Sequence, residues 1–305
     1  MEQLYEGCLA AKPMDKCKKH EYYEAVLLRV NKKDELIFQL GSKMGIMPLS
    51  EFSALSPNRS AAVKLCGKKL GFYVTGETND SYSLSRKQVQ QEYLDNVVSK
   101  YKVGDIITGK VSNIASNLCF VELGYGYTAL LMLENVCVAH INSLHQVFTE
   151  GQEIKVMVSE PLSNTNKLGV SMKELLGTWE ENLDFVDKEQ NEEILTGFVS
   201  RVADYGAYII LTPNLYGLCD EKIIEQKNLH EGDTVCCVIK RARKNNGKLV
   251  IRVCNNLGVL PDVSCYFQLH YFIEGKTFGD SWRYSPSKTF THRKTSVDTH
   301  EEAEG

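Results

Sequence analysis

The sequence contains no long apolar stretch. No uninterrupted apolar run approaches the roughly 20 residues that a membrane-spanning helix requires. The first residues include Glu2 and Glu6 and lack the apolar core of a signal peptide. We therefore expect a cytoplasmic protein with no membrane partner.

The ten cysteines are not arranged for metal binding or redox chemistry. No C-x-x-C pair occurs, and such a pair is the usual mark of zinc sites and of thioredoxin-like motifs. Most cysteines lie in apolar runs, as Cys119 does in Leu-Cys-Phe-Val. We predict buried free thiols that act as small hydrophobic residues, and no metal site.

Residue patterns that support catalysis are also missing. None of the seven histidines stands in a metal-binding or triad-like context. Gly124-Tyr125-Gly126 predicts a short hairpin turn and does not match a phosphate-binding loop. Since an enzyme needs a convergent set of titratable groups, we predict a non-enzymatic protein with no catalytic residues, no cofactor and no small-molecule substrate.

The clearest positive feature of the sequence is an internal repeat. Thr108–Ala115 and Thr196–Ala203 are identical at five of eight positions. Glu150–Ile154 and Glu231–Val235 match further along, in the same order, and a blurred third copy opens at Glu24–Val30. The opening strands fall near residues 25, 109 and 197, which gives a period of about 84–88 residues.

Each copy consists of short apolar segments with partial two-residue alternation, separated by Gly or Asn turns. Five such strands in about 70 residues predict a small closed barrel, because closure removes the exposed edges of a small sheet. The sequence therefore predicts an all-β fold of three tandem five-stranded barrels joined by short helices.

Composition between and after the repeats predicts the remaining segments. Val89, Tyr93, Val97 and Tyr101 form one stripe at four-residue spacing, as on an amphipathic helix. The last residues are rich in Ser, Thr, Lys and Glu, which predicts disorder. The expected domains are a degenerate repeat over 1–86, a helical linker over 87–101, a second repeat over 102–173, a helical linker over 174–190, a third repeat over 191–254, a C-terminal extension over 255–284 and a disordered tail over 285–305.

The motifs of the repeats resemble the RNA-binding domain named after bacterial ribosomal protein S-one, which is an OB-fold. The third repeat is most similar, since it contains Gly197-Phe198-Val199, Asp204–Ile209, Gly217–Asp220 and Gly232–Val235. The second repeat keeps Gly109-Lys110-Val111 and Phe120–Leu123, and the first keeps mainly Gly45–Glu51. The resemblance covers roughly residues 20–253 and extends to short, multi-repeat forms of the ribosomal protein.

This resemblance implies RNA binding, with aromatic side chains stacked on bases and basic side chains on phosphates. In the third repeat Tyr205 and Tyr208 occupy the two aromatic positions, and a bulge at Gly206 would bring both rings to one face. The alternative is that one tyrosine belongs to the barrel core. In the second repeat only Phe120 remains, and the first repeat has no aromatic pair there.

Basic residues are concentrated in the third repeat, although the net charge of the chain is −4. Lys240, Arg241, Arg243, Lys244, Lys248 and Arg252 lie within thirteen residues that contain no acid. Such a run is often only a solvated face. Here it follows the strand pair that borders the family's binding groove. The predicted RNA-binding residues are Tyr205, Tyr208, Arg201, Lys240, Arg241, Arg243, Lys248 and Arg252, with Phe120 and Lys110 in the second repeat.

Some positions depart from the family pattern. The family histidine is Met132 in the second repeat and Asp220 in the third, and Asn117 replaces the first aromatic residue of the second repeat. The resemblance favours a translation protein that binds single-stranded RNA, such as mRNA, with the small ribosomal subunit as a candidate partner. Two alternatives stay open: a protein-interaction scaffold built of degenerate OB-folds, and an accessory regulator of RNA decay or transcription.

Overall fold

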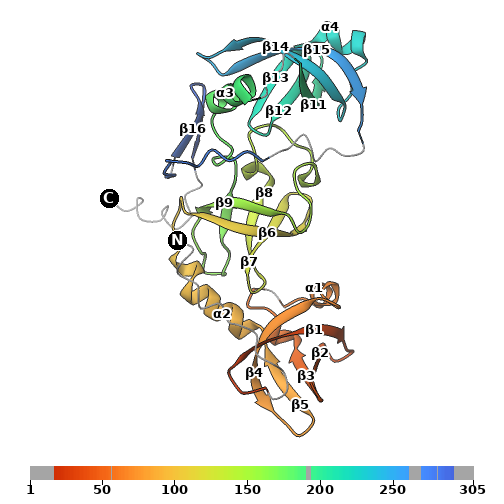
Figure 1. The fold of residues 1–305 in the computed structure, drawn as a ribbon, viewed down its shortest axis with the longest axis vertical. Helices are drawn as coiled ribbons and strands as arrows, with labels where there is room; N and C mark the ends of the chain where they lie inside the picture. Colours follow the sequence, from red (N-terminus) through yellow and green to blue (C-terminus); the bar gives the residue numbers. More distant parts are fainter. Residues whose placement is uncertain (1–16, 56, 190–193, 261–268, 280, 292–305) are drawn as a thin grey trace, which may run out of the picture. The chain divides into compact units, whose positions relative to one another are not determined.

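The described part of the chain contains three closed five-stranded β-barrels, which confirms the predicted all-β fold of tandem OB-like barrels (Figure 1). The computed structural model describes residues 17–55, 57–189, 194–260, 269–279 and 281–291. The chain divides into two compact units. One comprises residues 1–101 with 124–127 and 162–167, and the other holds the remaining residues.

The first barrel has the strand order β1-β2-β3-β5-β4. Its strands are β1 (Tyr22–Val30), β2 (Glu35–Leu40), β3 (Lys43–Pro48), β4 (Lys69–Glu77) and β5 (Ser81–Ser85). Leu27, Phe38, Met47 and Phe72 are fully buried in its core. The short helix α1 (Arg59–Lys64) precedes β4, and the Asn58 side chain caps it by accepting from the Ser60 N–H at 2.8 Å.

The second barrel follows the same plan, with the order β10-β8-β7-β6-β9. Its strands are β6 (Ile106–Ile114), β7 (Leu118–Gly124), β8 (Tyr127–Met132), β9 (Glu153–Glu160) and β10 (Gly169–Ser171). Val111, Val121, Leu131 and Val156 fill its interior.

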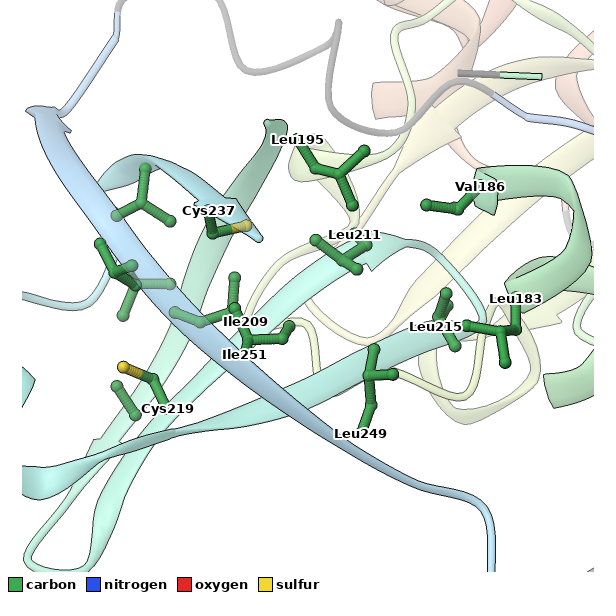
Figure 2. Packing of buried hydrophobic residues seen from close by; sticks show 14 of the residues in the cluster. Leu183, Val186, Leu195, Ile209, Leu211, Leu215, Cys219, Cys237, Leu249 and Ile251 are labelled. Carbon is green, nitrogen blue, oxygen red and sulfur yellow. The ribbon is translucent and has the colours of Figure 1, made fainter. Parts of the chain in front are cut away.

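The third barrel has the order β11-β12-β13-β15-β14. Its strands are β11 (Leu195–Ala203), β12 (Gly206–Thr212), β13 (Leu215–Asp220), β14 (Thr234–Arg243) and β15 (Lys248–Gly258). Figure 2 shows its core, in which Ile209, Cys219, Cys237 and Ile251 point inward from different strands. Buried cysteines thus act as small core residues, as the sequence predicted.

All three barrels carry a bulge at the same place in the first strand. The pairing with the second strand shifts between Leu27 and Arg29, between Val111 and Asn113, and between Val199 and Arg201. Because a bulge bends a strand and increases its twist, this shared irregularity lets each five-stranded sheet curl into a closed barrel.

Helices connect the barrels, as predicted. The helix α2 (Lys87–Asn96) follows the first barrel, and α3 (Trp179–Glu189) precedes the third. The side chains Leu183 and Val186 of α3 extend the core of the third barrel beside Leu215 (Figure 2). None of the helices in the described ranges has the length and apolar character that a membrane crossing demands.

The second and third barrels share one compact unit, and the buried side chain of Asn214 joins them. Asn214 stands in the turn between β12 and β13 and is fully buried. Its amide donates to the carbonyl oxygens of Lys173 and Gly177, both at 2.7 Å, and its Oδ1 accepts from the Val138 N–H at 2.9 Å. A third-barrel turn is therefore hydrogen-bonded to two segments that belong to the second barrel and its linker.

The C-terminal extension contains a hairpin of β16 (Ser281–Ser285) and β17 (Lys288–Thr291). Residues 285–291 thus differ from the predicted disordered tail, since backbone pairing with the aromatic segment of β16 orders a stretch whose composition is polar. The rest of that tail, 292–305, lies outside the described residues.

Candidate nucleic-acid interface

A row of outward-facing residues crosses all five strands of the third barrel. Arg201 on β11 pairs with Tyr208 on β12, and Tyr208 pairs with Leu218 on β13. Leu218 in turn lies opposite Val250 on β15, and Val250 opposite Arg241 on β14. The two arginines are exposed and the three residues between them are partly exposed. The row therefore places a cation at each end of an aromatic and aliphatic strip.

Three tyrosines gather around the β12 position of this row. The rings of Tyr205 and Tyr208 meet edge-on with centroids 6.3 Å apart, and their hydroxyls lie 3.0 Å apart. Tyr216 on β13 is a further 6.3 Å from Tyr208. Tyr205 is 58% exposed, Tyr208 is partly exposed, and neither belongs to the core cluster. The alternative that one of the predicted pair is a core residue is therefore wrong.

The two predicted tyrosines meet for a different reason from the one expected. Tyr205 lies in the two-residue turn between β11 and β12, and the bulge of this strand pair is on β11, between Val199 and Arg201. Gly206 is the first residue of β12 after this turn, and it allows a close approach to β13: its φ is +150°, and a Cβ there would lie 2.3 Å from the Cys219 carbonyl oxygen. Glycine is thus needed at the base of the aromatic cluster.

The groups around Tyr208 raise the pKa of its phenol. The hydrogen bond with Tyr205, partial burial and the nearby Tyr216 hold the pKa of Tyr208 above its ordinary value, and the Arg201 charge acts in the opposite direction. The phenol is therefore neutral at physiological pH and presents an uncharged ring.

Apart from Arg201 on β11, the predicted basic residues of the third barrel lie on the hairpin of β14 and β15. Lys248 and Arg252 alternate with Leu249 and Ile251, which point into the core, so both lie on the outer face of the hairpin. Arg241 pairs with Val250 and Arg243 with Lys248 on the same face. Lys240 stands in the bulge between Ile239 and Arg241. All five cations are exposed. The hairpin thus continues the row's positive end as a band of cations.

Asp220 has a structural role that the sequence did not reveal. It is the N-cap of helix α4 (Glu221–Lys227), and its carboxylate accepts from the Lys222 N–H at 3.1 Å. A carboxylate at a helix N-terminus also interacts favourably with the helix dipole. The acidic residue at the family's histidine position therefore stabilises a helix.

The equivalent row of the second barrel has different chemistry. Asn113 pairs with Phe120 where the third barrel pairs Arg201 with Tyr208. Leu130 lies opposite Gly169, and Gly169 opposite Glu160, so Glu160 takes the place of Arg241. Phe120 is partly exposed, but both row ends have lost their positive charge.

Lys110, the other predicted contact of the second barrel, lies among acids. Its cross-strand neighbours are Glu122 on β7 and Glu153 on β9. Two carboxylates beside one ammonium leave no local excess of positive charge to attract phosphate. The structure does not bring Lys110 into the row with Phe120.

The first barrel keeps only one part of the row. Arg29 occupies the position of Arg201, but its partner is the buried Ile37, followed by Ile46 and Ser83. An aromatic ring is absent from the row, as the sequence predicted.

Two members of the third-barrel row, Leu218 and Val250, and the neighbouring Tyr216 were not identified as site residues from the sequence. The place of Val250 depends on the register of the parallel pair β13 and β15, which are distant in sequence. The signal that could have found Tyr216 is its two-residue spacing from Leu218 on one strand. Among the described residues, no group of three or more His, Cys, Asp or Glu side chains is placed to hold a metal ion.

Comparison with known proteins matches one of the three repeats to a described domain family. Residues 100–173, the second barrel, match the family described as S1 RNA binding domain. This match confirms the resemblance read from the motifs, but it lies on the second repeat, whereas the motifs put the closest similarity on the third.

Relatives and one solved structure extend the comparison. The chain is 28% identical over 155 residues to the small ribosomal subunit protein bS1 of Staphylococcus aureus (strain COL), and 28% identical over 157 residues to its counterpart in Staphylococcus epidermidis. Each match covers 50% of this chain and 39% of the relative, so the chain spans about two fifths of the relatives' length. The solution structure of GSP13 from Bacillus subtilis is 24% identical, with a TM-score of 0.24, over 25% of this chain and 58% of that one.

Proposed function

We propose that this chain, which carries a domain of the S-one type, binds single-stranded RNA through the outer face of its third barrel. The observation that carries the proposal is the row of Tyr208, Leu218 and Val250 between Arg201 and Arg241. Exposed aromatic rings beside a band of cations are the recurring design of single-strand binders.

Each part of the row has a distinct task in this proposal. Bases stack on Tyr205 and Tyr208, which accept any base because every base has a π face. Arg201, Arg241 and the other cations of the β14–β15 hairpin contact phosphates. Those contacts release counterions, so affinity falls steeply with salt and depends weakly on RNA sequence.

The biological role we propose is in translation, with mRNA as ligand and the small ribosomal subunit as partner. Support comes from the relatives, which are ribosomal proteins by name. This role places the protein in the cytoplasm and requires no catalytic activity. A scaffold without RNA binding would be favoured by Asp220, Met132, Asn117 and the net charge of −4, but Asp220 has a separate role because it caps α4. Nothing described here favours a regulator of RNA decay or transcription.

Fluorescence anisotropy with labelled single-stranded RNA tests the binding proposal. The unaltered chain should bind at low salt and lose affinity as salt rises. Replacing both Tyr205 and Tyr208 with Ala should weaken binding about ten-fold or more. The matched control is Phe120→Ala, at the position in the second barrel equivalent to Tyr208, which should change little. Absence of binding at low salt would exclude the proposal and favour the scaffold.

Co-sedimentation with small ribosomal subunits tests the translation role separately. The chain should pellet with the subunits, and the Tyr205 and Tyr208 double variant should retain this association if another barrel provides it. RNA binding without any association with the subunit would leave a role outside the ribosome.

A further inference from the structure

The C-terminal hairpin packs against the third barrel beside its basic turn. The Ser287 hydroxyl donates to the Asn246 carbonyl oxygen at 2.9 Å, and Ser285 lies against Gly247 in the same β14–β15 turn. Tyr284 is buried in the third-barrel core and donates to the Asn214 carbonyl oxygen at 2.5 Å. Figure 1 shows β16 beside α3. The hairpin is therefore a fixed addition to the barrel.

A concavity with a volume of about 400 Å³ lies next to this hairpin. This volume falls in the range of roughly 300–1,000 Å³ typical of small-ligand sites. Thr178, which precedes α3, and Glu181 in its first turn line one side, and the C-terminal extension lines the rest. The lining residues from the extension are Lys276, Thr277, Phe278, Gly279, Ser281 and Trp282.

The chemistry of the concavity suits a neutral, flat group. Trp282 and Phe278 are both partly exposed and offer aromatic surface. Lys276 and Glu181 form an ion pair at 2.5 Å, so the two charges compensate one another within the lining. A nucleobase is uncharged and stacks on aromatic rings, whereas a bare phosphate would gain little from a compensated pair.

The basic turn that contacts the hairpin carries a further cation. Lys244 lies in that turn and is exposed. The contacts of Ser285 and Ser287 hold the turn and β16 together. A strand that follows the β14–β15 hairpin therefore meets positive charge up to the point where the turn contacts the C-terminal hairpin.

We propose that the concavity beside Trp282 is a second base-binding subsite, in which the indole stacks on a nucleobase of the RNA strand that passes over the β14–β15 turn. This inference rests on the proposed function, since it extends the same RNA path. The ligand class is single-stranded RNA, and the subsite serves only strands long enough to leave the tyrosine cluster.

The experiment compares short and long single-stranded RNA on the full chain. Oligonucleotides of about 4 and about 12 nucleotides lie at the short end and in the upper half of the range of sites on one OB-fold. Trp282→Ala should weaken the long oligonucleotide about ten-fold and leave the short one unchanged. Trp282→Phe, which keeps a stacking ring, should restore most of the loss.

Intrinsic fluorescence provides a second measurement that needs no variant. The chain has two tryptophans, and Trp179 is only 1% exposed. The long oligonucleotide should quench the emission of Trp282, while the short one should not. This fluorescence measurement tests the subsite even if Trp282→Ala fails to fold.

The outcomes separate the subsite from the proposed function. Long RNA that binds the unaltered chain without quenching, and binds Trp282→Ala equally well, would overturn the subsite and leave the third-barrel site standing. If neither oligonucleotide binds the unaltered chain, both proposals fail.

Discussion

At the scale of single residues, Arg241 separates the third barrel from the second, where Glu160 holds the equivalent position. Arg241→Ala should weaken RNA binding several-fold at low salt. It should also lower the slope of log affinity against log salt by about 0.7, the value for one phosphate contact on a single strand. Anisotropy titrations at several salt concentrations measure both effects.

The matched control for Arg241 is Lys110→Ala in the second barrel. Lys110 lies between Glu122 and Glu153, so its loss should change neither affinity nor slope. An unchanged slope in Arg241→Ala, or an equal change in Lys110→Ala, would contradict the assignment of phosphate contacts to the third barrel.

The buried cysteines predict how stability depends on alkaline pH. Burial raises the pKa of Cys119, Cys137 and Cys237 to about 12, from an ordinary value of 9.0. The unfolded chain releases these protons near the ordinary value, while the folded chain keeps them to about 12. Between these two pKa values the unfolded state binds fewer protons, so the free energy of unfolding falls as pH rises.

Denaturant unfolding at about pH 8 and about pH 10 measures this loss. Cys237→Ala removes one of the three thiols and should show a smaller decrease between the two pH values. A decrease as large as that of the unaltered chain would show that other groups cause the loss.

At the scale of secondary-structure elements, Asp220 combines two effects that point in opposite directions. Its carboxylate caps α4 and places a negative charge beside the aromatic cluster, since Asp220 pairs with Gly206. Asp220→Ala should lower the free energy of unfolding by about 1 kcal/mol, the usual value of an N-cap. Denaturant unfolding measures this change.

Asp220→Asn divides the two effects, because Asn caps helices as well as Asp does. This variant should keep the stability of the unaltered chain and bind RNA more tightly at low salt, as one negative charge is removed. Equal destabilisation by Asn and Ala would show that the carboxylate charge, rather than the hydrogen bond, stabilises α4.

Local sequence patterns were sufficient to predict the barrels but insufficient to predict the interface row. Strands, Gly turns and the helix α2 follow from spacing within a few residues, which the chain carries locally. The place of Val250 opposite Leu218 depends on the register between β13 and β15, and this register is set by the packing of segments distant in sequence. The capping role of Asp220 is not visible in the motif, which shows only a departure from the family histidine. The strand β17 lies in a segment whose polar composition predicted disorder.

At the scale of the whole molecule, the hydrogen bonds of Asn214 link the second and third barrels, so we expect these two barrels to unfold together. Asn214→Ala removes the partner of the Val138 N–H and of two carbonyl oxygens. Each buried group left unpaired costs about 1–3 kcal/mol. Calorimetry should therefore show a lower midpoint and separate transitions for the two barrels.

Asn164→Ala provides the control for this substitution, because Asn164 is an exposed asparagine in a turn of the second barrel. It should leave the thermal profile unchanged. A single transition at the original temperature in Asn214→Ala would show that the two barrels are coupled by other contacts.

Because the second and third barrels share the row, two substitutions would give the second barrel the same row chemistry as the third. Because the second barrel already presents Phe120 at the position of Tyr208, only Asn113→Arg and Glu160→Arg are needed to supply the two end cations. Two tethered sites on one chain raise the effective concentration of each for a strand that can reach both, and linked sites commonly gain about 10²–10⁴ in avidity. Because only the third barrel has a cation at both ends of its row, we expect the natural chain to bind RNA on one barrel, and a strand bound there to exchange readily.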